Sequence, residues 1–312
     1  MVISVTLNPA IDAYLEVNKL IPGSFHRTEI EVYSPGGKGF ITAEILLKLG
    51  YSEVVSTGLL AGRNGLRWED AATQMGVPGS YVYIYEGETR TNIQLVDLST
   101  NSVTSISTKG PMVSHKDIER LKKRLRPHLN RAEWIVFGGS LPSGLTVDTY
   151  YELIKYFNRL GKKTVINATV DFLPRAAEAI PFKLVEDPKE GEDHFGDFKV
   201  YSLDDEIRLA KMLMEQGIEV VSLSWKTIHN IIGVFGEVYR VDVVDPHIMS
   251  ILGANSALTA GLIHAIEIGM KGPDIAKNAV ATAYAVATKL EPDIDGIFQV
   301  KQVYDHIKVE KV

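Results

Sequence analysis

The chain of 312 residues contains no cysteine, which excludes disulfide bonds, thiolate metal ligands and a cysteine nucleophile. It has no block of five or more like charges and a formal net charge of -6, so binding to nucleic acid or to a membrane surface is not expected. No apolar run reaches the roughly 18 residues of a membrane span. Residues 1–7 lack the basic segment of a signal peptide and predict a first strand. We therefore expect a cytoplasmic protein.

The eight histidines show neither an H-x-x-x-H nor an H-E-x-x-H spacing, so the sequence predicts no dedicated zinc site and no protein metal ligands. A hydrophobic content of 45% and a charged content of 23% are typical of a globular protein. The length suits one large α/β unit, which we assign to residues 1–312 as a single domain.

Short apolar runs alternate with amphipathic segments along most of the chain. This rhythm predicts a mostly parallel sheet that is covered by helices on both faces. The predicted strands are residues 2–7, 54–59, 134–137, 163–167 and 220–224, with a hairpin over 234–244. The predicted helices are residues 39–49, 68–75, 114–125, 147–160, 203–216, 256–269 and 275–288.

Five other segments alternate apolar and polar side chains with a period of two, which indicates half-exposed antiparallel strands. They are residues 13–17, 29–33, 81–85, 91–96 and 103–107. We expect them to form a separate small sheet, a lid built from about residues 12–34 and 80–108. Long exposed strands expose unpaired edges, so the lid is also predicted to pair with a second copy as a homodimer.

Two glycine-rich segments, residues 36–39 and 138–144, each precede a predicted helix. Glycines allow the backbone to approach a ligand closely, and the amides at the helix start can bind an anion, to which Lys38 adds a positive charge. An ordinary turn is the alternative for the first segment, which matches neither G-x-x-x-x-G-K-[ST] nor G-x-G-x-x-G. In the second, Pro142 stands where a nucleophile elbow needs glycine, which disfavours a hydrolase built on Ser140.

Four segments together are more specific than any one of them. They are Thr6–Asp12, Pro35–Gly39, Thr89–Asn92 and Gly139–Gly144. In this order and at these spacings they resemble the PfkB branch of the ribokinase-like carbohydrate kinases, most closely its 1-phosphofructokinase and tagatose-6-phosphate kinase group. The resemblance spans essentially the whole chain. It implies a ribokinase-like three-layer α/β/α sandwich with a small β lid that covers the sugar and commonly forms a dimer interface.

The resemblance also implies roles in binding a sugar phosphate. Asp12 would bind sugar hydroxyls, and the backbone of Gly37 would line the pocket. Arg27 and Arg90 would hold the substrate phosphate, a task suited to a forked guanidinium. A surface ion pair is the alternative reading for Asp12 and Arg90. The other residues that the resemblance places in this pocket are Lys38, Asn92 and Ser140.

The turn that carries catalysis in this family differs here. The family uses a G-A-G-D turn whose Asp is the general base and whose following amides stabilise the developing charge. The corresponding residues are Gly253, Ala254, Asn255 and Ser256. Asn255 tolerates a left-handed backbone, so we expect the turn to persist. An unassisted Ser256 is no base near neutral pH, and losing such a base typically removes about 100- to 10,000-fold in rate.

Other segments on the nucleotide side also depart from the family pattern. They are residues 167–170, 186–191 and 222–227, where the family has D-x-S-G, K-P-N-x-x-E and S-L-G-x-x-G. On the sugar side, Ile41 replaces an Asn that contacts the sugar in the family. Ser224 and Lys226 remain as candidate nucleotide ligands, with a solvated lysine as the alternative for Lys226. Asp245 or His247 is a candidate substitute base, and ordinary loop residues are the alternative for both.

Two hypotheses follow from these sequence features. In the first, the protein binds a phosphorylated ketose such as fructose or tagatose phosphate and transfers phosphate weakly or not at all, with no cofactor. In the second, it is an active ATP-dependent sugar or sugar-phosphate kinase that uses Mg-ATP and a substitute base.

Overall fold

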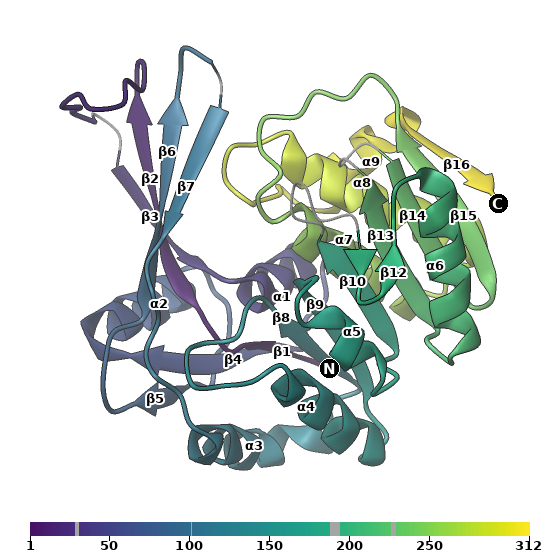
Figure 1. The fold of residues 1–312 in the computed structure, drawn as a ribbon, viewed down its shortest axis with the longest axis horizontal. Helices are drawn as coiled ribbons and strands as arrows, with labels where there is room; N and C mark the ends of the chain where they lie inside the picture. Colours follow the sequence, from purple (N-terminus) through teal and green to yellow (C-terminus); the bar gives the residue numbers. More distant parts are fainter. Residues whose placement is uncertain (29–30, 101, 188–193, 226–228) are drawn as a thin grey trace.

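In the computed structural model, residues 1–28, 31–100, 102–187, 194–225 and 229–312 are described. Within these ranges one large sheet forms the centre of the protein (Figure 1). Its strands are β1 (Val2–Thr6), β4 (Val54–Ala61), β5 (Val82–Ile84), β8 (Trp134–Gly138), β9 (Lys163–Thr169), β10 (Lys183–Asp187), β13 (Val220–Trp225), β14 (His229–Val234), β15 (Glu237–Val243) and β16 (Ile307–Lys311).

The strand order is β16-β15-β14-β13-β10-β9-β8-β1-β4-β5. All pairs from β5 to β13 are parallel, and β14, β15 and β16 add an antiparallel edge. Parallel strands must be buried on both faces, which explains their nearly continuous apolar runs.

Helices cover both faces of this sheet and bury two apolar cores. The first layer contains α1 (Lys38–Lys48), α2 (Gly62–Gln74), α7 (Ala254–Glu267), α8 (Gly272–Ala287) and the short α9 (Ile297–Gln302). The second contains α3 (His115–Leu129), α4 (Asp148–Arg159), α5 (Leu173–Ala177) and α6 (Leu203–Glu215). Successive residues of β8 alternate between the cores, with Val136 in the first and Phe137 in the second. The predicted three-layer α/β/α fold is therefore confirmed.

A second sheet projects from the body (Figure 1) and is called the lid below. Its order is β3-β2-β6-β7, from β2 (Ala10–Val17), β3 (Glu31–Gly36), β6 (Arg90–Asp97) and β7 (Ser102–Ser107). The central strands β2 and β6 are parallel, so the expectation of a purely antiparallel lid was wrong. Strand β2 starts four residues after β1 ends, so the first strand of the body leads directly into the lid.

The segment 81–85 was wrongly assigned to the lid. It forms β5, the last strand of the main sheet, and pairs in parallel with β4. Its alternation arises because Val82 and Ile84 face the second core, where they join Ile118 and Leu121 of α3. An edge strand with one covered face has the same period-two pattern as a lid strand.

The antiparallel edge of the main sheet, formed by β14, β15 and β16, also differs from the predicted pattern. The hairpin turns at Phe235 and Gly236, so its first strand is β14 and not residues from 234 onward. Strand β16 was not predicted, because three of its five residues are charged and solvent-facing positions dominate its pattern. It pairs antiparallel with β15 at the sheet edge.

One lysine lies inside the first core. Lys183 of β10 is 1% exposed, lies beside Val165 and Val220, and its ammonium nitrogen has no hydrogen-bond partner among the described residues. Burial lowers the pKa of Lys183 well below its usual value, because the charged form of the amine is disfavoured away from water. An unsatisfied buried donor of this kind costs stability.

We expect Lys183→Met to raise the free energy of unfolding by about 1–3 kcal/mol at neutral pH. Because the pKa of this lysine is lower in the folded chain than in the unfolded chain, the unfolded chain binds the proton more readily, and the stability of the unsubstituted protein rises as the pH rises toward 10.5. The variant lacks that rise. Urea unfolding at pH 6 and pH 9 measures both effects, with the exposed Lys211→Met as control. A loss of stability in Lys183→Met, or an equal gain at both pH values, would contradict the assignment.

Candidate functional site

A pocket of about 330 Å³ lies between the lid and the body, where strands of the main sheet end. Thr6 ends β1, Gly139 and Ser140 follow β8, and Thr169 ends β9; all four line the pocket. Ligands of open α/β sheets bind at the carboxyl ends of strands, so this pocket is the candidate functional site.

The lid contributes one polar wall to the pocket. Arg90, Asn92 and Gln94 alternate along β6, and Asp12 and Tyr14 alternate along β2, so one face of each strand lines the pocket. Asp12 lies opposite Asn92 in register, as Tyr14 lies opposite Gln94. The period of two therefore gathers five hydrogen-bonding side chains on the inner face of the lid.

A chain of hydrogen bonds links this wall to the body. Asn92 Nδ2 donates to Asp12 Oδ1 at 2.7 Å, and Arg90 Nη1 donates to Asn92 Oδ1 at 3.2 Å. Arg90 Nε donates to the carbonyl oxygen of Asn8 at 3.2 Å, and Asn8 Nδ2 donates to Ser140 Oγ at 3.1 Å. Arg90 is thus held by both the lid and the body, in an orientation suited to binding an anion.

Burial sets the electrostatics of the same wall. Burial raises the pKa of Asp12 to about 6, against the lowering effects of the Asn92 hydrogen bond and the Arg90 charge. Burial likewise lowers the pKa of Arg90, and Asp12 opposes that change. The guanidinium remains charged at all physiological pH values. The wall therefore combines a fixed cation with a carboxyl group that takes up a proton in mildly acidic solution.

Two helices begin at the opposite wall. Gly37 precedes α1 with φ 131°, and Gly253 precedes α7 with φ 77° in the left-handed region. A Cβ atom on Gly37 would lie 2.5 Å from Thr6 Cγ2, and one on Gly253 would lie 2.3 Å from Pro292 Cβ. Both turns therefore require glycine, and both place the start of a helix in the pocket wall.

The α7 turn persists for a different reason from the one expected. Gly253 has the left-handed backbone, whereas Asn255 lies inside the helix and lines the pocket. The explanation through the tolerance of Asn255 was wrong. Ala254 is the first helical residue, and its amide donates to the carbonyl oxygen of Ile251 at 3.2 Å.

Ser256 lies in the first turn of α7 and lines the pocket. It is 1% exposed, and its hydroxyl has no hydrogen-bond partner among the described residues. Its carbonyl oxygen accepts a bond from Thr42 Oγ1 at 3.3 Å, which joins α7 to α1. The first turn of α7 has no acidic residue and no side-chain cap, so no carboxylate on this turn offsets the positive end of the helix dipole.

A buried hydrogen bond between β9 and α7 positions this helix against the sheet. Asn167 of β9 is fully buried and its Nδ2 donates to Thr259 Oγ1 at 3.4 Å. Thr259 Oγ1 in turn donates to the carbonyl oxygen of Asn255 at 2.9 Å. Asn167 thus supports the helix that carries Ser256.

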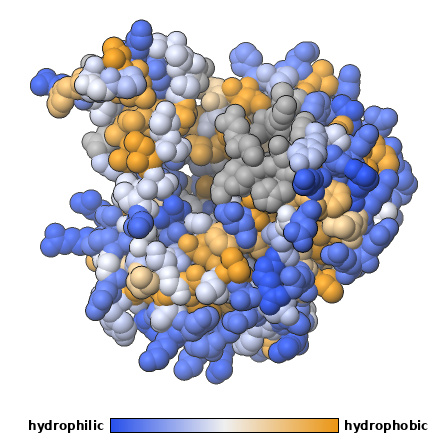
Figure 2. All heavy atoms as spheres, in the orientation of Figure 1, coloured by the Kyte–Doolittle hydropathy of each residue, from blue (hydrophilic) through white to orange (hydrophobic). Residues whose placement is uncertain are grey.

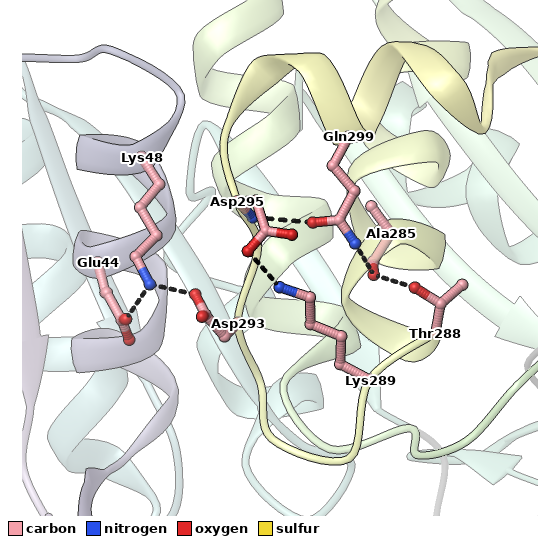
Figure 3. Close-up of polar contacts among 8 residues, drawn as sticks. All are labelled: Glu44, Lys48, Ala285, Thr288, Lys289, Asp293, Asp295 and Gln299. Atoms are coloured by element: carbon pink, nitrogen blue, oxygen red, sulfur yellow. Dashed lines mark hydrogen bonds and ion pairs between the residues drawn. The ribbon is translucent and has the colours of Figure 1, made fainter.

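An ion pair network holds the loop that covers the Gly253 turn (Figure 3). Lys48 Nζ lies 2.8 Å from Glu44 Oε1 and also pairs with Asp293, so the ammonium bridges α1 and this loop. Burial raises the pKa of Glu44, with the bond to Lys48 opposing it. Lys289 pairs with Asp295 in the same loop, 2.7 Å apart. These contacts keep Pro292 against the Gly253 turn and in the pocket wall.

The structure brings together most of the residues that the sequence placed in a site. The predicted residues that line the pocket are Asp12, Gly37, Lys38, Arg90, Asn92, Ser140, Gly253, Asn255 and Ser256. Ala254 lies between two of them. Arg27 does not join the pocket, because it is exposed in the connection between β2 and β3.

The candidate bases and nucleotide ligands have other locations. Asp245 and His247 are exposed in the connection between β15 and α7, and neither lines the pocket. Lys226 and the side chains of Ser224 and Trp225 lie outside the described residues.

Several pocket residues were given no role from the sequence, among them Asn8, Tyr14, Gln94 and Pro292. Asn8 was part of a quoted segment, and its position directly after a strand was the available signal. Tyr14 and Gln94 could have been found by extending the alternation from Asp12 and Asn92. Pro292 gives no such signal, because it reaches the pocket only through the Lys48 network.

A parallel sheet between two helical layers, with a polar lid over its carboxyl edge, defines a ribokinase-like α/β protein. The pfkB family carbohydrate kinase description matches residues 2–223, so the chain belongs to this family. It is 25% identical to the 1-phosphofructokinase of Bacillus subtilis (strain 168) over 312 residues, covering 100% of both chains. It is 26% identical to that of Borreliella burgdorferi over 313 residues, covering 100% of this chain and 99% of the other.

Solved structures show the same similarity. A Thermotoga maritima protein described as a possible 1-phosphofructokinase has a TM-score of 0.92 and 28% identity, covering 100% of this chain and 99% of that one. Phosphofructokinase-2 from Escherichia coli has a TM-score of 0.87 at 16% identity, covering 97% and 98%, and shares the fold.

Kinases of this family use ATP with magnesium, which requires groups that can hold a metal ion and the phosphates. Asp12 is the one carboxylate among the described pocket residues, and it is bound to Asn92 on the lid. No group of three or more His, Asp or Glu side chains that could hold a metal ion occurs in the described ranges. The described pocket thus contains two helix starts but no carboxylate beside α7. In the same ranges, every helix is too short or too polar to cross a membrane.

We expect Asp12→Asn to raise the free energy of unfolding by up to about 3 kcal/mol at pH 7.5. Asp12 titrates at about 6 when folded and at 3.8 when unfolded, so ionisation costs folding free energy as the pH rises from 4 to 6. Below pH 4 both states are protonated and the difference disappears. Urea unfolding at pH 4 and pH 7.5 measures it, with exposed Asp245→Asn as control. A loss of stability in Asp12→Asn at pH 7.5 would contradict the effect of burial.

Proposed function

We propose that this protein binds a phosphorylated ketose, such as fructose or tagatose phosphate, in the pocket under the lid, and that it transfers phosphate weakly or not at all. The observation that carries the proposal is Ser256 at the start of α7, where the family has its catalytic Asp. Arg90 and Asp12 remain on the sugar side, so binding capacity and catalytic capacity are separated in this chain.

The sugar side supports binding through chemistry that needs no nucleotide. The Arg90 guanidinium has a fixed orientation and is largely removed from water, which strengthens its attraction to a phosphate. Asp12 accepts from Asn92 and has a second carboxylate oxygen for a sugar hydroxyl. Ser140 and Lys38 line the same cavity. A ketose phosphate has both the anion and the hydroxyls that these groups recognise.

The α7 side supports weak or absent transfer. Phosphoryl transfer to a sugar needs a group that accepts the proton of the attacking hydroxyl. Among the residues that the structure describes, the buried Ser256 hydroxyl has no partner that could act as a base, and Asp245 and His247 are exposed outside the pocket. Loss of the base alone lowers the rate by about 100- to 10,000-fold.

The second candidate function is an active ATP-dependent sugar-phosphate kinase with a substitute base. Similarity to 1-phosphofructokinases along the whole chain favours it. Under this function, turnover is measurable with Mg-ATP and is abolished by Asp245→Ala or His247→Ala.

We also propose that the protein acts in the cytoplasm as a homodimer that pairs through the lid. Tyr33, Leu98 and Ile106 of the lid region are exposed, and Figure 2 shows apolar residues on the visible side of this projection. Covering exposed apolar side chains and strand edges favours pairing with a second copy.

We expect fructose 1-phosphate, fructose 6-phosphate or tagatose 6-phosphate to bind without nucleotide, and Arg90→Met to weaken that binding by roughly 10- to 100-fold, as expected for a lost charge-assisted contact. Isothermal titration calorimetry measures both constants. Arg159→Met, which removes an exposed guanidinium at the end of α4, is the matched control and leaves the affinity unchanged.

A coupled assay with Mg-ATP completes the test. Turnover close to that of an active family member would overturn the proposed loss of transfer. Absence of binding by all three sugar phosphates would overturn the proposed binding.

A further inference from the structure

We propose that the pocket selects a deoxy ketose phosphate, in which the carbon beside Ile41 carries no hydroxyl group. This inference rests on the proposed function and specifies its ligand. It assigns the selection to four apolar residues that line the pocket, Ile41, Ile251, Leu252 and Pro292, which are called the apolar wall below.

The apolar wall brings together three segments that are far apart in the sequence. Ile41 lies near the start of α1, Ile251 and Leu252 precede the Gly253 turn, and Pro292 follows α8. A Cβ atom on Gly253 would lie 2.3 Å from Pro292 Cβ and 3.4 Å from Ile41 Cγ2, so these residues meet at one place on the pocket surface. Ile41 is only 7% exposed, so packing holds its side chain in position.

The Lys48 network supports this wall from a second cavity (Figure 3). That cavity of about 80 Å³ is lined by Ile41 and Pro292 together with Glu44, Lys48 and Asp293. Lys48 bridges Glu44 and Asp293, so these three charged groups are paired with one another. Ile41 and Pro292 line both cavities, which places them between the paired charges and the ligand pocket.

The apolar wall offers a sugar hydroxyl no side-chain partner, and three of its four residues have no backbone donor to spare. The amide of Ile41 donates to the carbonyl oxygen of Gly37 at 3.0 Å, and the amide of Leu252 donates to Ser250 Oγ at 3.2 Å. Pro292 has no N–H. A hydroxyl placed against this wall loses water without gaining a donor, whereas a C–H group there gains apolar burial.

The lid side of the pocket keeps its polar groups. Asp12 accepts from Asn92, and Arg90 is held by Asn8 and Asn92, so a ligand meets a hydroxyl acceptor and a cation there. The pocket is thus polar along the lid and apolar beside Ile41. A ketose phosphate that lacks one hydroxyl has the same division, with its phosphate and remaining hydroxyls on one side and hydrocarbon on the other.

The test is isothermal titration calorimetry without nucleotide. One series is fructose 6-phosphate with its 1-deoxy, 3-deoxy and 4-deoxy analogues, and the other is fructose 1-phosphate with its 3-deoxy, 4-deoxy and 6-deoxy analogues. We expect at least one analogue to bind roughly 5- to 100-fold more tightly than its parent, the range over which an apolar pocket discriminates against a hydroxyl group.

Ile41→Asn adds a group that can bond the missing hydroxyl, so it is expected to reduce the preference for that analogue by at least about 3-fold, mainly by tightening the parent. Ile268→Asn is the matched control, because it adds the same amide at an exposed position at the far end of α7. It is expected to leave the preference unchanged. Ile41→Thr keeps the branched Cβ and covers the case in which Ile41→Asn does not fold; the same direction of change is expected.

The outcomes separate this inference from the proposed function. Binding of a parent sugar phosphate with no analogue tighter than its parent overturns the inference and leaves the proposed function standing. A preference that Ile41→Asn and Ile41→Thr both leave unchanged also overturns it, because a merely structural residue would alter the affinity of parent and analogue alike. Absence of binding by every sugar phosphate and every analogue overturns both.

Discussion

The hydrogen-bonded chain that runs from Asp12 through Asn92 and Arg90 to Asn8 connects the lid to the body. Because β2 continues directly from β1, any shift of the lid register would separate these side chains. The parallel pairing of β2 with β6 gives Asp12 and Asn92 their opposing positions, and Arg90 then reaches back to the main sheet. The polar wall of the pocket is thus a consequence of strand register.

The opposite wall depends on backbone conformation and not on side-chain charge. Gly37 and Gly253 allow two helices to begin within contact of the sheet and of Pro292, where any larger residue would collide. Helix amides at such starts bind anions whatever the next side chain is. Under the proposed function, Ser256 removes proton acceptance from this wall without removing its attraction for phosphate, which would make binding and transfer separable.

The layered fold could be predicted from the sequence, because continuous apolar runs mark buried parallel strands. About half of the residues that line the pocket could also be predicted, from glycine-rich turns that precede helices and from the family resemblance. Which strands pair with one another could not be predicted from the sequence. The alternation in 81–85 is equally compatible with a lid strand and with β5, and only packing of Val82 and Ile84 against α3 distinguishes them. Arg27 was placed in the pocket by resemblance, but its position depends on the path of the connection between β2 and β3, which local sequence does not determine.

Residue 256 also affects how long a product would stay. In a kinase with Asp at this position, the phosphoryl group that has just been transferred lies beside a carboxylate, and their repulsion assists its departure. With Ser256 the same place offers a neutral donor, so a molecule carrying phosphate at both ends would lose that assistance. Under the proposed function, a single change from carboxylate to hydroxyl would lower the capacity for turnover and would lengthen the residence of a doubly phosphorylated product. Both effects favour binding over catalysis at one position of one helix.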